Sequence, residues 1–193
     1  MTIVLVATAA VVALLLLRAS AARRAASETL DFRGPVRAVE VAVAAGQVTV
    51  RGGARSDARV RRTTLRRIRR PRVAELVDDG VLRLDAPTGV VHYELDVPRG
   101  AAVVVRGAST SATVINVGGT VELRSESGSL EGRGLAGPAV RAVTDDGSIR
   151  LSFDRAPTLV EAATRTGEVE LVLPEGDTDI RTSSPSAARI ARR

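Results

Sequence analysis

Few side chains in this 193-residue chain could carry out chemistry, since it contains no Cys and a single His. The missing Cys excludes disulfides, thiolate nucleophiles and Cys-ligated zinc. His92, Glu94 and Asp96 alternate along an expected strand, and such spacing can present metal ligands on one face. The alternate positions Val91 to Val97 are apolar or aromatic, so we interpret the trio as the polar side of a half-buried strand. We therefore predict no metal site.

Acidic residues offer one route to catalysis. Asp145 and Asp146 precede a glycine, and Arg150 and Asp154 follow within one short segment. Clustered acids with Arg are used by polysaccharide lyases and hydrolases, which we keep as an alternative function. Aromatic residues make up only 2% of the chain, so carbohydrate-stacking platforms are scarce. We predict that the protein is not an enzyme.

A glycine-rich segment, Gly132 to Gly137, matches the spacing GxGxxG of dinucleotide-binding loops. That loop must open a helix whose N-terminus holds the pyrophosphate. Here Pro138 and an expected strand at 140–144 follow instead. We interpret the segment as a turn and predict no cofactor.

The positive charge is concentrated in one window. Nine arginines and one acid lie between Arg55 and Arg72, so this window carries +8 and the rest of the chain −2. Runs of charge are often merely solvated, so we favour a solvated loop or hairpin here; the competing hypothesis is that the guanidinium groups pair with phosphates of lipid headgroups or cell-wall polymers. Nucleic acid is not an expected partner. The candidate anion-binding residues are Arg61, Arg62, Arg66, Arg67, Arg69, Arg70 and Arg72.

The N-terminus is strongly apolar. Residues 3–17 contain no charge, and a helix over residues 1–17 would be about 25 Å long, close to the roughly 30 Å of a bilayer core. We predict a membrane anchor or signal segment at 1–21, with a small-residue cleavage pattern at 19–21, and a linker at 22–35. Arg18, Arg23 and Arg24 follow the apolar run, and the positive-inside rule would keep the rest cytoplasmic. Orientation therefore stays open.

The remaining chain repeats a short pattern in which a glycine precedes alternating aliphatic residues. Three units begin at Gly128, Gly147 and Gly167, separated by 19 and 20 residues. Alternation sends Leu130, Ile149 and Val169 to one face of their strands. Ser125, Thr144 and Thr164 recur at matching positions and would form a column of hydroxyls.

These features predict an all-β domain at 36–180, with an Arg-rich insertion at 55–72 and a disordered basic tail at 181–193. Stacked repeats fill a narrow interior with aliphatic columns, and glycine supplies tight corners, so we expect a β-solenoid-like repeat domain preceded by one hydrophobic helix. An antiparallel β-sandwich is the alternative, because frequent turn signals are also typical of that fold.

The chain resembles a bacterial family of unknown function described as putative adhesins. The likeness covers roughly residues 36–180 and rests on the apolar N-terminus, the serial glycine units and two strand ends, Val97-Pro-x-Gly100 and Leu173-Pro-x-Gly176. It implies a right-handed solenoid-like domain held at the cell envelope, with no catalytic residues. We therefore expect a non-catalytic structural or binding module, membrane-anchored or exported, on the extracytoplasmic side. A cytoplasm-facing regulatory module remains an alternative.

Overall fold

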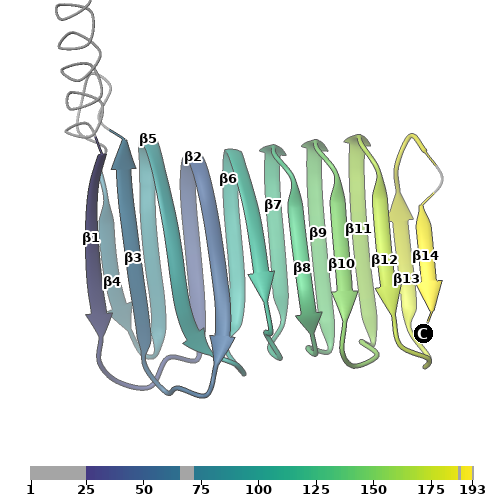
Figure 1. Cartoon of the computed structure of the whole chain (residues 1–193), viewed down its shortest axis with the longest axis horizontal. Helices are drawn as coiled ribbons and strands as arrows, with labels where there is room; N and C mark the ends of the chain where they lie inside the picture. Colours follow the sequence, from purple (N-terminus) through teal and green to yellow (C-terminus); the bar gives the residue numbers. More distant parts are fainter. Residues whose placement is uncertain (1–24, 66–71, 187, 193) are drawn as a thin grey trace, which may run out of the picture.

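A computed structural model describes residues 25–65, 72–186 and 188–192, and these residues form only β-strands, turns and bends (Figure 1). The all-β prediction is confirmed. The predicted membrane segment at 1–21 lies outside the described residues. Within the described ranges, no helix has the length and apolar character required to cross a bilayer.

Fourteen strands belong to one hydrogen-bonded sheet. Their bounds are β1 Ala25–Phe32, β2 Ala38–Gly53, β3 Ala58–Leu65, β4 Ala74–Asp78, β5 Val81–Pro98, β6 Ala102–Ile115, β7 Val121–Ser127, β8 Leu130–Leu135, β9 Ala139–Asp146, β10 Ile149–Phe153, β11 Leu159–Thr166, β12 Val169–Leu173, β13 Asp179–Ser183 and β14 Arg189–Arg192.

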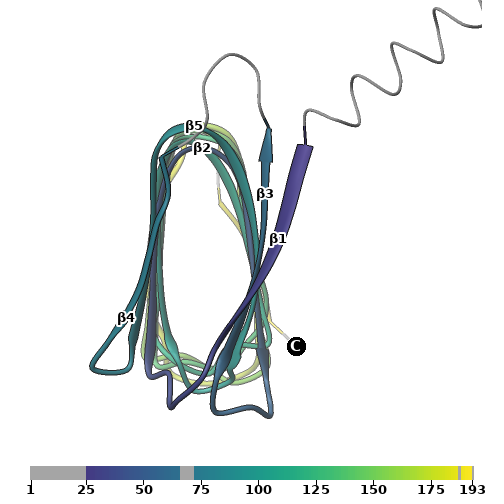
Figure 2. The ribbon, with the colours of Figure 1, turned by 90° about the vertical axis from the view of Figure 1, so that its left-hand side faces the viewer.

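The sheet bends so that its strands form two facing walls, which outline a narrow loop when viewed along the long axis (Figure 2). The first wall runs through β4, β5, β2, β6, β7, β9, β11 and β13, and the second through β1, β3, β5, β2, β6, β8, β10, β12 and β14. The long strands β2, β5 and β6 contribute one half to each wall. Among the strands that the structure describes, antiparallel pairing involves only β1, β3 and β4 with their neighbours, so the antiparallel sandwich is wrong.

Aliphatic columns fill the space between the walls. Ile149 pairs in register with Leu130 on one side and Val169 on the other. All three side chains are at most 1% exposed. Fully burying such a side chain stabilises the fold by about 1.5–3 kcal/mol. The alternation of aliphatic and polar residues therefore places the core between the walls and the charges outside.

Glycines occupy a corner where successive repeats touch through their backbones. A Cβ on Gly147 would lie 2.3 Å from the carbonyl oxygen of Gly128, and one on Gly167 would lie 2.2 Å from that of Gly147. Gly128 and Gly147 also have positive φ, whereas Gly167 does not. Close approach, more than backbone conformation, therefore requires glycine at the three levels occupied by Gly128, Gly147 and Gly167.

Buried hydroxyls tie each repeat to the preceding one. Ser125, Thr144 and Thr164 lie side by side in register and are 4%, 1% and 5% exposed. Thr144 Oγ1 donates to the carbonyl of Gly128 at 3.2 Å, and Thr164 Oγ1 to that of Gly147 at 2.8 Å. The column thus satisfies polar groups that would otherwise be orphaned at the corner.

Three predicted segment assignments need correction. The expected linker at 22–35 contains β1, and the Arg-rich insertion at 55–72 contributes β3, which pairs with β1 and β5. The tail at 181–193 is not disordered in its described part, because β13 and β14 continue the two walls. An unpaired strand edge offers backbone donors and acceptors that order a neighbouring segment even when its side chains are polar.

Candidate functional site

The N-terminal half of the second wall carries a charged groove on its outer face. Antiparallel pairing sets Asp31 of β1 beside Arg59 of β3, and Arg59 beside Asp96 of β5. The parallel register of β5 with β2 then sets Asp96 beside Arg51. The groove has a volume of about 410 Å³ and is lined by Thr29, Asp31, Arg51, Arg59, Arg61, Glu94 and Asp96.

Acids and bases alternate across the charged groove. Arg59 Nε donates to Asp31 Oδ1 at 2.7 Å, and this hydrogen bond raises the pKa of the Arg59 guanidinium. Arg51 and Arg61 make no ion pair within 4 Å among the described residues. Three arginines face three carboxylates, so the groove is neutral overall but presents two arginines that remain available to a phosphate or carboxylate.

Arg62 lies on the other side of β3 and closes the N-terminal end of the interior. Its guanidinium forms ion pairs with Glu28 of β1 and Glu75 of β4, the second at 2.6 Å. Tyr93 Oη donates to Glu75 at 3.5 Å. We call these four residues the N-terminal cap. Because the Arg62 side chain is only 17% exposed and holds two carboxylates, it serves the fold here.

Burial sets the protonation behaviour of the N-terminal cap. Burial raises the pKa of the Glu75 carboxyl, although the Arg62 charge opposes this. Burial opposes protonation of Arg62, but Glu75 and Glu28 raise its pKa overall. Burial also raises the pKa of Tyr93. Removing one partner from such a partly buried pair costs more than the pair contributes, since a charge is left without compensation.

The structure thus separates the predicted anion-binding arginines. Arg61 faces the charged groove, Arg62 belongs to the N-terminal cap, and Arg72 is exposed just before β4. Arg66, Arg67, Arg69 and Arg70 lie outside the described residues. At the start of the window, Arg55 pairs with Asp57 at 2.9 Å, and this hydrogen bond lowers the pKa of Asp57.

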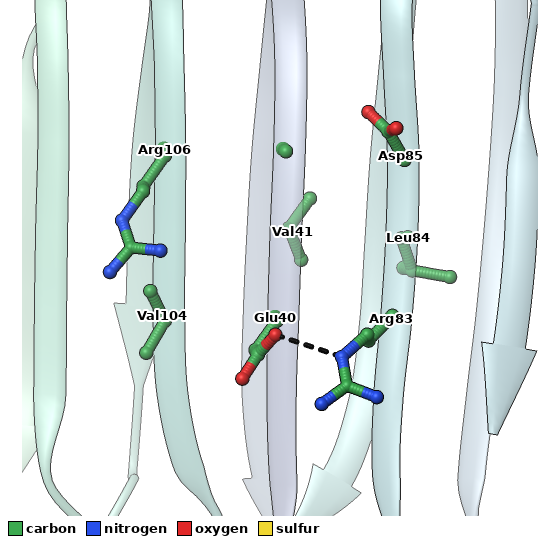
Figure 3. A pocket seen from close by; sticks show the side chains of 8 residues that line it. Glu40, Val41, Arg83, Leu84, Asp85, Val104 and Arg106 are labelled. Atoms are coloured by element: carbon green, nitrogen blue, oxygen red, sulfur yellow. Dashed lines mark hydrogen bonds and ion pairs between the residues drawn. The ribbon is translucent and has the colours of Figure 1, made fainter. Parts of the chain in front are cut away.

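A second depression lies on the outer face of the first wall (Figure 3). It measures about 150 Å³ and is bordered by the outward-facing Glu40, Arg83, Val104 and Arg106. Arg83 Nε donates to Glu40 at 3.1 Å, and Arg106 pairs with Glu122 at 3.3 Å. Both of its arginines are already paired with carboxylates, and Asp85 adds a further negative charge, so it offers an anion a weaker site than the charged groove.

The residues considered for catalysis do not meet. Asp145 and Asp146 end β9, whereas Asp154 follows β10. The five residues of β10 span about 16 Å at 3.3 Å per residue, too far for one pair of carboxylates to act on one bond. Within the described ranges, no three His, Asp or Glu side chains gather in a way that could hold a metal ion.

The sequence alone did not identify the acidic residues that pair with arginines in the charged groove and in the N-terminal cap. Glu28 and Asp31 fall in the predicted linker, and Glu75 lies on a short strand with no repeat pattern. One signal was present: alternation from Ala58 through Val60 places Arg62 on the inward face of β3.

No family model and no curated protein matches this chain. Comparison with solved structures finds ten matching chains. One is a putative cell adhesion protein from Clostridium sporogenes, with 10% identity and a TM-score of 0.46 over 88% of this chain and all of the other. A putative adhesin from Bacteroides fragilis has 15% identity and a TM-score of 0.36 over 87% of this chain and 97% of the other.

A putative lipid binding protein from Parabacteroides distasonis is also similar, with 12% identity and a TM-score of 0.27 over 86% of this chain and 96% of the other. Four of the matching chains are named as putative adhesins or as a putative cell adhesion protein, the class that the sequence resembles.

Proposed function

We propose that the two walls form a right-handed β-solenoid that acts as a rigid, non-catalytic module of the cell envelope. In-register parallel pairing between successive repeats supports this fold, as do the aliphatic, hydroxyl and glycine columns. Parallel crossover connections are almost always right-handed. The interior is packed with side chains, so binding is left to the outer faces.

The N-terminal end of this module is the part that we assign to a membrane surface rich in anionic lipid. The observation that carries this assignment is the register of β1 with β3, in which Ala25 is the partner of Leu65. Ala25 follows the predicted membrane segment, and Leu65 precedes the arginines at 66, 67, 69, 70 and 72. If residues 1–21 insert into a bilayer, these arginines are held at its surface.

Arginine suits this task because its planar guanidinium pairs bidentately with phosphate and is always charged. Each basic residue near an anionic membrane surface contributes about 1 kcal/mol of attraction, which falls within a Debye length. Arg61 lies on β3 and its side chain faces outward into the charged groove. Arg72 is exposed just before β4, the first strand of the first wall. The contact is thus electrostatic and sensitive to salt.

Negative charge on the corners of the later repeats restricts the membrane contact to the N-terminal end of the module. Register places the corners after β7, β9 and β11 on the side where β1 begins. These corners carry the exposed acids Glu126, Asp145, Asp146 and Glu168, against one arginine, Arg165. An anionic surface would repel them, so the far end of the module should stand away from the membrane.

Limited trypsin digestion of the full chain in vesicles tests the proposal. On phosphatidylcholine containing phosphatidylglycerol, cleavage between Arg66 and Arg72 should be slower than on phosphatidylcholine alone, and high salt should abolish the difference. Cleavage after Arg33 provides the control, because this residue is exposed beyond the other end of β1.

The same digestion separates the two sources of phosphate. Protection by soluble polyphosphate, without any protection by phosphatidylglycerol, would assign the arginines to a cell-wall polymer. Equal cleavage under all conditions would contradict anion binding altogether. Labelling of an introduced cysteine on intact cells would test the extracytoplasmic location, since only an exported domain reacts with an impermeant reagent.

A further inference from the structure

Each outer face carries a ladder in which acidic and basic residues alternate from one strand to the next. On the second wall, register places Glu131, Arg150, Glu170 and Arg189 side by side. Arg150 Nε lies 3.4 Å from Glu170 Oε2. Stacked strands are about 4.8 Å apart, so equal charges at successive levels would repel one another. Alternation removes this repulsion.

The ladder on the second wall ends on an arginine that lacks one of its two acidic neighbours. Arg150 has Glu131 on one side and Glu170 on the other, whereas Arg189 has only Glu170. Among the described residues, Arg189 makes no ion pair within 4 Å. On the first wall the corresponding Arg181 already pairs with Asp179 at 2.8 Å, so the vacancy is specific to β14.

The apolar column beside this ladder ends in the same way. Ile190 is the register partner of Leu171, which is fully buried, but Ile190 is 45% exposed. In the described chain β14 pairs with β12 alone, so its other edge has backbone groups without a strand partner. At the opposite end of the molecule β1 and β4 are edge strands as well, but there the N-terminal cap covers the end of the apolar interior with ion pairs.

We propose that the free edge of β14 accepts an extended segment of a partner protein in which carboxylate and aliphatic side chains alternate. Its backbone would extend the second wall by one strand, its carboxylate would take the vacant place beside Arg189, and its aliphatic side chain would cover Ile190. A second copy presenting β14 would instead bring the arginines of two RIAR segments together. Charge therefore favours an acidic partner over self-pairing.

Binding of a fluorescent peptide to the full chain tests this proposal. The probe is GEVELVLPE, which has the required alternation, and its partner probe is GKVKLVLPK, with the charges reversed. Arg189→Glu should weaken binding of the acidic probe about tenfold at low salt and should make the reversed probe bind instead. Arg165→Glu is the matched control, because Arg165 is also exposed and lies at a corner away from this edge.

The binding of the two probes to the two variants decides whether the edge of β14 accepts an acidic segment. Acidic-probe binding that is lost in Arg189→Glu, kept in Arg165→Glu and restored by reversing the probe supports the proposal. Equal loss in both variants, or equal binding of a scrambled acidic probe, overturns it as non-specific attraction. Concentration-dependent self-association that Arg189→Glu abolishes, without probe binding, would also overturn it in favour of a second copy.

Discussion

Four glycine-to-alanine substitutions separate the two reasons for which a corner requires glycine. Gly147 has both a φ of +146° and a neighbouring carbonyl at 2.3 Å from an added Cβ. Gly167 has only the close carbonyl, at 2.2 Å, and Gly34 has only the positive φ of +117°. Gly100 has neither, since nothing lies within 4 Å of an added Cβ. The chain thus supplies its own controls.

The expected losses follow from these geometries. A non-glycine residue in a rarely populated backbone region costs about 1–3 kcal/mol, which is the loss expected for Gly34→Ala. Ordinary contacts begin near 3.4 Å, so Gly167→Ala must push two repeats apart by about 1 Å, and forced overpacking costs about 1–3 kcal/mol or more. Gly147→Ala should lose roughly the sum of both, whereas Gly100→Ala should be neutral or stabilising by up to about 1 kcal/mol.

Urea unfolding followed by circular dichroism measures these differences as shifts in the free energy of unfolding. The decisive variant is Gly167→Ala, because only contact between neighbouring repeats can penalise it. A Gly167→Ala protein as stable as Gly100→Ala would refute the stacked corner. A uniform loss in all four variants would mean that the cost is not set by the geometry described above.

Three further changes have defined outcomes. Thr144→Val removes the hydroxyl that donates to Gly128 and should lower the free energy of unfolding by about 1–2 kcal/mol, whereas Thr120→Val, at an exposed site, should not. Burial raises the pKa of Glu75 above its ordinary value of 4.5, so its protonated form stabilises the fold below pH 4.5, and this contribution is lost as the pH rises through the folded-state pKa. The stability of the wild type relative to Glu75→Gln, measured by urea unfolding, should therefore fall as the pH rises above 4.5. Cysteines at the paired positions Ala26 and Thr64 should form a disulfide in the folded chain, and failure to cross-link under mild oxidation would contradict the register of β1 with β3.

The repeats could be predicted from the sequence because each repeat contains the same recurring residue types. Leu130, Ile149 and Val169 keep both their spacing and their alternation, and hydroxyls and glycines recur beside them. Alternation also placed Tyr93 inside and Glu94 outside, and the structure confirms both positions. The local sequence pattern is enough to predict the strands where every repeat packs against its neighbours in the same way.

The two ends could not be predicted in this way, since they depend on pairing between distant segments. β1 has no repeat partner in sequence, and it is ordered by β3, which lies more than twenty residues later. β14 is basic and short, and it is ordered by the edge of β12. The two ion pairs of the N-terminal cap, from Arg62 to Glu28 and to Glu75, form only when three strands meet, so the composition of the Arg-rich window could not predict the surroundings of Arg62.

The most direct test of the proposed function is a depth measurement at both ends of β3. A fluorophore on Thr64→Cys would mark the end beside Ala26, and one on Ser56→Cys, in the bend that precedes β3, would mark the opposite end, about 25 Å away. In vesicles containing phosphatidylglycerol, a quencher attached to the lipid should quench the label at position 64 strongly and the label at 56 weakly, and high salt should reduce the difference. Equal quenching at the two positions, or stronger quenching at position 56, would contradict a membrane-facing N-terminal end.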